Sequence, residues 1–131
     1  MINQVTKDKV ELLHQQYIRL AKGRERALYE TAMSELPDMV YNSNAIENST
    51  LTLQDTEAII VHDKIIQDHE IREIYEAKNL VRVTTELMKN PNERMSVGLI
   101  LSLHSLLMNG VRDDIAGRFR SGDEWVRVGT H

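Results

Sequence analysis

The sequence predicts an all-α fold that ends in a β-hairpin. Apolar residues recur at helical spacing through most of residues 7–108, and Pro, Asn and Gly separate the periodic segments. After Gly117 the pattern changes to two short extended runs on either side of Ser121-Gly122-Asp123, which is typical of a hairpin. The chain contains one Phe and one Trp, so the core must be built from Leu, Ile, Val and Met.

The first long helix is expected over residues 7–35. Its apolar stripe consists of Val10, Leu13, Tyr17, Leu20, Leu28, Ala32 and Leu36. Gly23 interrupts this stripe, and glycine inside a helical pattern favours a kink or a frayed turn at that point.

A short helix is expected from Pro37 to Glu47, because proline is tolerated in the first turn of a helix and Asp38 suits its positive end. Asn48 then occupies the position of a C-terminal cap, which often needs a left-handed backbone. Glu47 therefore lies at the negative end of the helix dipole, where a carboxylate is mildly unfavourable. Such an acid is either a solvated surface charge or a group kept for function.

A third helix is expected to begin after Thr52, because Thr52 and Asp55 have the spacing of a helix N-cap. Its apolar residues are Ala58, Ile59, Val61, Ile65 and Ile66. The polar run Q-D-H-E separates it from a helix over residues 70–88, which Asn90-Pro91 ends.

The apolar face of this helix over residues 70–88 consists of Ile71, Ile74, Ala77, Val81 and Met88. Ser96 is expected to cap the last helix, and Asn109-Gly110 is expected to close it. One face of that helix carries Val97, Ile100, His104 and Leu107.

Composition and charge exclude several classes of protein. The 131 residues are 41% hydrophobic and 27% charged, which fits one globular domain rather than a disordered chain. The net charge of -4 argues against nucleic-acid binding, and no apolar run approaches the ~18 residues that span a membrane. The chain has no cysteine, and its N-terminus lacks the apolar segment of a signal peptide; both features suit the cytoplasm.

The histidines do not predict a metal site. If one helix ran through His62 and His69, their backbones would lie ~10 Å apart along its axis, too far for easy sharing of one ion. Both are expected on a solvated helix face and turn. His104 lies in an apolar stripe and is expected to be a packed, hydrogen-bonded histidine.

The C-terminal residues leave alternatives open. An arginine cluster there could bind an anion such as phosphate or could simply solvate a loop; it consists of Arg112, Arg118, Arg120 and Arg127. Trp125 could anchor a partner or pack back onto the helices. The sequence contains no G-x-S-x-G, no P-loop, no H-E-x-x-H and no cysteine nucleophile.

One segment resembles the inhibitory motif of Fic-domain proteins. The run S-N-A-I-E-N matches (S/T)-x-x-x-E-(G/N), and A-I-E-N-S-T-L-T-L resembles the family's A-I-E-G-N-T-L-T-L. Further along, I-L-S-L-H-S-L-L-M-N-G resembles the family helix I-x-x-I-H-x-x-L. The run A-G-R-F-R-S-G-D-E-W-V-R-V-G-T-H resembles its flap hairpin, G-x-(Y/F)-R…V-x-(I/V)-G-x-H. The order and spacing agree over residues 38–131.

Fic proteins typically transfer AMP from ATP to hydroxyl side chains of target proteins. Their catalytic loop, H-x-F-x-(D/E)-G-N-G-R-x-x-R, is absent from this sequence, and none of the five histidines is followed by Phe two positions later. In the family that loop follows the flap, so the chain is expected to end before it. The resemblance implies that this chain alone does not catalyse AMP transfer and binds neither ATP nor Mg²⁺ tightly; both are cofactors of the complete enzyme.

The resemblance assigns roles to three groups of residues. Ser43, Glu47 and Asn48 would form the inhibitory site, in which Glu47 pairs with the arginine that otherwise holds the γ-phosphate of ATP, helped by a hydrogen bond from Ser43. The nucleotide would be contacted by Val128, Gly129, Thr130 and His131. The target protein would dock on the flap by strand addition, at Trp125, Val126 and Arg127.

The resemblance implies that the chain has two parts. Residues 1–52 would hold the N-terminal helix and the inhibitory helix with its motif at 43–48, and residues 53–131 the first part of a Fic core, up to the flap. The remaining core would come from the same gene or from another chain, and a homo-oligomer is left open.

Two other interpretations stay open. In one, the fragment inhibits an active Fic core in trans, like an antitoxin. In the other, the chain is an unrelated helical interaction module.

Overall fold

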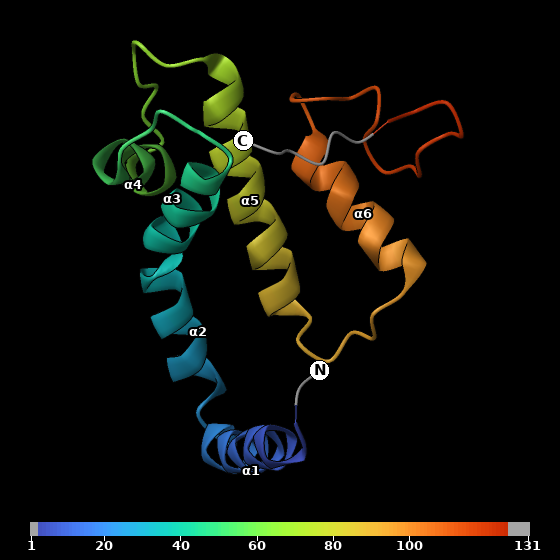
Figure 1. Ribbon diagram of the computed structural model, residues 1–131. Coiled ribbons are helices and arrows are strands. Elements are labelled where there is room, and N and C mark those ends of the chain that lie inside the picture. Colours follow the sequence, from blue (N-terminus) through green and yellow to red (C-terminus); the bar gives the residue numbers. More distant parts are fainter. Residues whose placement is uncertain (1–2, 126–131) are drawn as a thin grey trace. The chain divides into compact units, whose positions relative to one another are not determined.

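The computed structural model describes residues 3–125 and divides the chain into two compact units, Met1–Glu35 and Leu36–His131. All regular secondary structure in the described residues is helical (Figure 1), so the all-α part of the expected fold is confirmed there. In the same stretch, no helix is both long enough and apolar enough to cross a lipid bilayer.

The first unit contains α1 (Gln4–Ala21) and α2 (Glu25–Ser34). The side chain of Asn3 caps α1 by accepting a 2.8 Å hydrogen bond from the N–H of Thr6. The single helix expected over residues 7–35 is divided in two at Gly23, the position where the sequence indicated a kink or frayed turn and where φ is +77°. The N–H of Gly23 donates to the Glu25 carboxylate at 2.9 Å, so this turn has its own hydrogen bond.

The second unit is built around three helices that pack on one another, α3 (Leu36–Ile46), α4 (Leu53–His62) and α5 (Ile71–Lys89). Its buried apolar side chains are Leu36, Val40, Leu51, Ile59 and Ala77. The turn between α3 and α4 supplies one of them, Leu51, so this turn is part of the core rather than a loose connection.

The expected start of α4 is confirmed and its expected length is not. Thr52 and Asp55 form a capping box in which each side chain bonds the backbone of the other. The helix ends at His62, because Asp63 takes a left-handed conformation with φ +49° and pairs with Lys78 of α5 at 2.5 Å. Ile65 therefore lies beyond the helix and is 83% exposed.

The last helix, α6 (Val97–Met108), packs on α5 and is capped by Ser96 as expected. A polar contact between the two helices is made by Asn79, which lies on α5 and is fully buried. Its amide donates to the carbonyl of Leu107 at 3.1 Å and to that of Asn109 at 2.6 Å. Asn79 thus satisfies carbonyls at the C-terminal end of α6 that lack partners within the helix.

The expected C-terminal β-hairpin is contradicted. Residues 118–125 form turns and irregular backbone, without a strand, and residues 126–131 lie outside the described part of the chain. Local bonds close this segment instead: Arg118 donates to both carboxylate oxygens of Glu124, at 2.7 and 2.5 Å. The same carboxylate accepts from the N–H of Ser121, and the N–H of Glu124 donates to the carbonyl of Ser121. These groups bond within one turn instead of across a ladder.

Gly117 holds the segment after α6 close against that helix. Its φ is +68°, and a Cβ atom at this position would lie 2.9 Å from the Cβ of Ser105 and 3.3 Å from the carbonyl oxygen of Leu101. Any other residue would therefore be strained by its backbone conformation and would collide with α6.

Replacing Asn79 by Ala should lower the free energy of unfolding by about 2–3 kcal/mol, because two carbonyls at the end of α6 lose their donor in a buried site. Urea denaturation measures this change. Asn42→Ala, at an exposed position of α3, is the matched control and should stay within about 0.5 kcal/mol of wild type. Equal losses in the two variants would contradict the bridging role of Asn79.

Gly117→Ala should destabilise the protein by about 2 kcal/mol through backbone strain and the collision with Ser105. Gly122→Ala is the control, because a Cβ at Gly122 meets no atom within 4 Å. Thermal unfolding of both variants gives the comparison, and an unchanged midpoint for Gly117→Ala would show that the segment does not lie against α6 as described.

Candidate functional site

The C-terminus of α3 has the hydrogen-bond pattern of a Schellman motif. Asn48 has φ +64°, its N–H donates to the carbonyl of Ala45 at 3.2 Å, and the N–H of Ser49 donates to the carbonyl of Asn44 at 3.1 Å. The predicted left-handed cap at Asn48 is confirmed. The helix consequently stops at a defined place, and the backbone of Glu47 is fixed between α3 and this cap.

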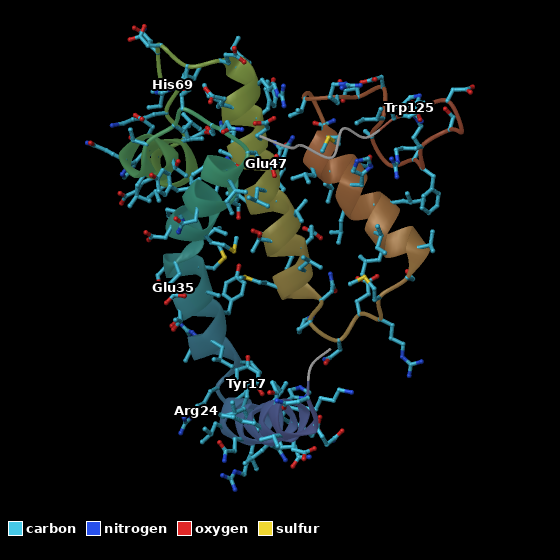
Figure 2. The ribbon with its side chains drawn as sticks, viewed as in Figure 1. Tyr17, Arg24, Glu35, Glu47, His69 and Trp125 are labelled. Carbon is cyan, nitrogen blue, oxygen red and sulfur yellow. The ribbon has the colours of Figure 1, made fainter. Side chains whose placement is uncertain are left out.

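The side chain of Glu47 is exposed at the end of α3, beside α5 (Figure 2). Among residues 3–125, no hydrogen bond or ion pair involves its carboxylate. Ser43 lies one turn earlier on the same side of the helix and is also exposed, but the two side chains are not joined by a hydrogen bond in the described structure. The carboxylate is accessible to a group from outside these residues.

Glu47 borders a small hollow of about 130 Å³. Its lining includes four carboxylates and one guanidinium, from Glu47, Glu70, Glu73, Glu76 and Arg72. Arg72 donates to Glu76 at 2.7 Å, so its charge is already engaged. A hollow with this surplus of negative charge favours a cation and disfavours phosphate.

The turn that follows Glu47 is held by Glu73, near the start of α5. One carboxylate oxygen of Glu73 accepts from the backbone N–H of Thr50 at 2.5 Å, and the other accepts from the Thr50 hydroxyl at 2.9 Å. The second oxygen also accepts from the N–H of Glu70 at 3.3 Å, at the first turn of α5. Glu73 thereby joins the turn after α3 to the N-terminus of α5, where the helix dipole favours a negative charge.

Glu73 is ionised in this position although it is 8% exposed. Burial raises the pKa of Glu73, but the hydrogen bonds from the N–H and hydroxyl of Thr50, with further bonds from Ser49 and Glu70, lower it more. The net pKa of the carboxyl group lies below its ordinary value of 4.5. The charge of Glu73 is therefore part of the folded structure.

His69 completes this group of residues, which we call the turn clamp: Thr50, Asp55, His69 and Glu73. The Nδ1 atom of His69 lies 2.9 Å from the Thr50 hydroxyl oxygen and 3.8 Å from Glu73, and its Nε2 atom lies 3.5 Å from Asp55. The His69 side chain is 16% exposed. The expectation of a solvated histidine is therefore wrong, because His69 lies between α4, the turn and α5.

The turn clamp was not visible in the sequence pattern. The capping pair Thr52 and Asp55 is a local signal, whereas Thr50 is separated from His69 and Glu73 by 19 and 23 positions. The polar run that contains His69 gave no indication that one of its side chains would turn inward.

Of the residues expected to contact the nucleotide or the target protein, only Trp125 lies in the described part of the chain. Trp125 is 95% exposed and does not pack on the helices. Val126, Arg127, Val128, Gly129, Thr130 and His131 lie outside the described residues. Trp125 borders a hollow of about 440 Å³ that His104, Ile115 and Glu124 also line.

Two arginines of the cluster, Arg112 and Arg118, are paired with nearby acids. Arg112 donates to both oxygens of Asp114, at 2.8 Å each, and Arg118 is paired with Glu124. Both interactions lower the pKa of the acid involved, to about 2 for Glu124. Arg112 and Arg118 therefore do not offer two unpaired charges to an anion.

His104 is half-buried, and its Nδ1 accepts a 3.2 Å hydrogen bond from the N–H of Gly117. The expectation of a packed, hydrogen-bonded histidine is confirmed. Across residues 3–125 the structure shows no group of three or more His, Asp or Glu side chains placed to hold a metal ion.

In comparisons with protein-family models, curated proteins and solved structures, nothing matches this chain.

The turn clamp predicts how stability depends on pH. The folded-state pKa values of Glu73 and Asp55 are lowered, so their contribution is present above the ordinary values of 4.5 and 3.8 and is lost as pH falls through the lowered values. Urea unfolding from pH 7 to 3 should show this loss. Glu73→Gln should be about 2 kcal/mol less stable at pH 7 and less dependent on pH, because the accepting carboxylate is gone.

The control for this series is Glu57→Gln, which replaces an exposed acid on α4. It should keep the wild-type slope between pH 5 and 3. A Glu73→Gln profile that runs parallel to wild type would show that Glu73 is not ionised and bonded as described.

Proposed function

We propose that this chain is the N-terminal regulatory part of a Fic-type protein adenylyltransferase, in which Glu47 blocks productive binding of ATP. The resemblance around S-N-A-I-E-N suggests the role. The observation that supports it most is the position of Glu47: an exposed carboxylate at the capped end of α3, on the rim of a hollow lined with acids.

The electrostatics of this rim suit a guanidinium as the partner. An arginine that approaches Glu47 also approaches Glu70, Glu73 and Glu76, and planar Arg–carboxylate pairs are strong because two hydrogen bonds form in parallel. A phosphate would be repelled by the same carboxylates. An arginine bound here is thus withdrawn from the γ-phosphate of ATP, and the α-phosphate is no longer aligned for attack.

Catalysis itself would depend on residues that this sequence does not contain, the H-x-F-x-(D/E)-G-N-G-R loop with its base histidine. That part, from the same gene or a second chain, would bind ATP and Mg²⁺ in the complete cytoplasmic enzyme. By resemblance, Val128–His131 would contact the nucleotide, and residues 125–127 the target protein.

Inhibition in trans is the second candidate, and the incompletely covered surface of α6 supports assembly with a Fic core in either format. The helix is apolar around most of its circumference, yet none of its residues is buried; Val97 is 58% and Ile100 49% exposed. A helix of this composition is normally covered on all sides. A Fic core could cover it either within one protein or as a separate chain.

Glu47→Gly should relieve inhibition. We expect AMP transfer from labelled ATP to rise by at least about tenfold, the factor lost with one charge-assisted arginine contact. The assay uses this chain together with a Fic catalytic core, on one polypeptide or added as a second chain. Glu57→Gln, an exposed acid on α4, is the matched control and should leave labelling unchanged.

Equal labelling with wild type and Glu47→Gly, both when the core is on the same polypeptide (joined format) and when it is added as a second chain (mixed format), would contradict the inhibitory role. The chain would then be an interaction module of another kind. An effect only in the mixed format would assign the chain to inhibition in trans.

A further inference from the structure

We propose that α1 is a self-association surface, at which two copies of this chain pair through an antiparallel coiled coil of their α1 helices. Large apolar side chains lie along this helix, yet none of its residues is buried. No residue of α2, the other helix of the first unit, is buried either. The surface is separate in sequence from the proposed inhibitory site, so the inference does not depend on the proposed function.

The spacing of the apolar side chains on α1 indicates that another helix covers them. Four of them recur at intervals of three, four and three residues: Val10, Leu13, Tyr17 and Leu20, which we call the α1 seam. These four residues are 53–60% exposed. Alternating intervals of three and four average 3.5 residues, the period at which the side chains of two supercoiled helices interdigitate.

The α1 seam is complementary to itself when the second helix runs antiparallel. In that register Val10 of each copy meets Leu20 of the other, and Leu13 of each copy meets Tyr17 of the other. All four layers of the contact are then apolar, and each layer joins a smaller side chain to a larger one. The same surface on both copies makes the contact, so two-fold symmetry closes the assembly at a dimer.

The charges beside the seam select the antiparallel direction. Lys7 and Lys9 flank the seam near the N-terminus of α1, and no acid occupies a flanking position. The acids of α1, Asp8 and Glu11, lie on the opposite face and are hydrogen-bonded by glutamine side chains of the same helix. In a parallel pair the lysines of both copies would gather beside two positive helix ends. In an antiparallel pair they lie beside the C-terminal end of the second copy's α1, where the helix dipole is negative.

The area of this contact predicts a weak dimer. Two antiparallel copies overlap over residues 9–21 and would bury roughly 1,000 Å² in total, which is below the range of stable interfaces. Because α1 already begins at the side-chain cap of Asn3, little of the cost of forming the helix falls on association. We expect a reversible monomer–dimer equilibrium with a Kd on the order of 10 µM.

Sedimentation equilibrium of the full chain, from about 1 to 500 µM, measures this association. Leu13→Gln should raise the Kd at least about tenfold, because each dimer loses two leucines from its seam. Leu12→Gln is the matched control: Leu12 is 57% exposed, against 53% for Leu13, but lies about 100° away around the helix. It should leave the Kd within about twofold of wild type. Far-UV circular dichroism should show equal helicity in both variants, since neither side chain is buried.

Lys9→Glu tests the direction of the two helices. In the antiparallel pair the new acid lies at the negative end of the second copy's α1, so the Kd should rise about threefold. In a parallel pair the same substitution would relieve the repulsion between lysines and lower the Kd. A tighter dimer of this variant would therefore overturn the antiparallel arrangement.

Three further results would overturn the proposal. The first is a chain that stays monomeric over the whole concentration range, and the second is a dimer that Leu13→Gln and Leu12→Gln weaken equally. The third is a dimer that Ile100→Gln disrupts and Leu13→Gln does not, which would place the contact on α6. None of these results bears on the inhibitory role of Glu47, which the labelling assay tests separately.

Discussion

The structure around the candidate site depends on one buried carboxylate. Glu73 accepts from the N–H and the hydroxyl of Thr50 and from the N–H of Glu70, so a single side chain ties the turn after α3 to the beginning of α5. A buried charge is costly unless it is hydrogen-bonded, and here those bonds lower the pKa of Glu73 despite its burial. The turn therefore cannot leave its place without depriving a buried charge of most of its hydrogen-bond donors.

This constraint explains how an exposed residue can have a fixed position. The carboxylate of Glu47 makes no hydrogen bond or ion pair within residues 3–125, yet the backbone around it is held: by the hydrogen bonds that end α3 on one side, and by Thr50 and buried Leu51 on the other. A carboxylate fixed through its backbone keeps its charge available to a partner. An inhibitory carboxylate needs this geometry, because it binds a partner arginine only if its position is fixed and no other group is paired with it.

Local signals in the sequence located most helix boundaries, because they rest on bonds between residues three or four positions apart. The cap at Asn48, the Thr52–Asp55 capping box and the Ser96 cap are examples. Contacts between distant residues were missed for the same reason. The end of α4 depends on Asp63 and Lys78, the clamp on Thr50, His69 and Glu73, and no spacing rule connects them. The hairpin prediction was wrong for residues 118–125, which are held by local bonds such as that of Arg118 to Glu124 that no turn pattern signals.

Amide hydrogen exchange at Thr50 tests the central claim most directly. If Glu73 holds the turn that carries Glu47, the Thr50 N–H of the wild-type chain should exchange at least about a hundredfold more slowly than an unprotected amide, and Glu73→Gln should remove most of that protection. Protection at Ala77, in the middle of α5, should persist in the variant if the helix remains folded. An unprotected Thr50 amide in the wild-type chain would contradict the account.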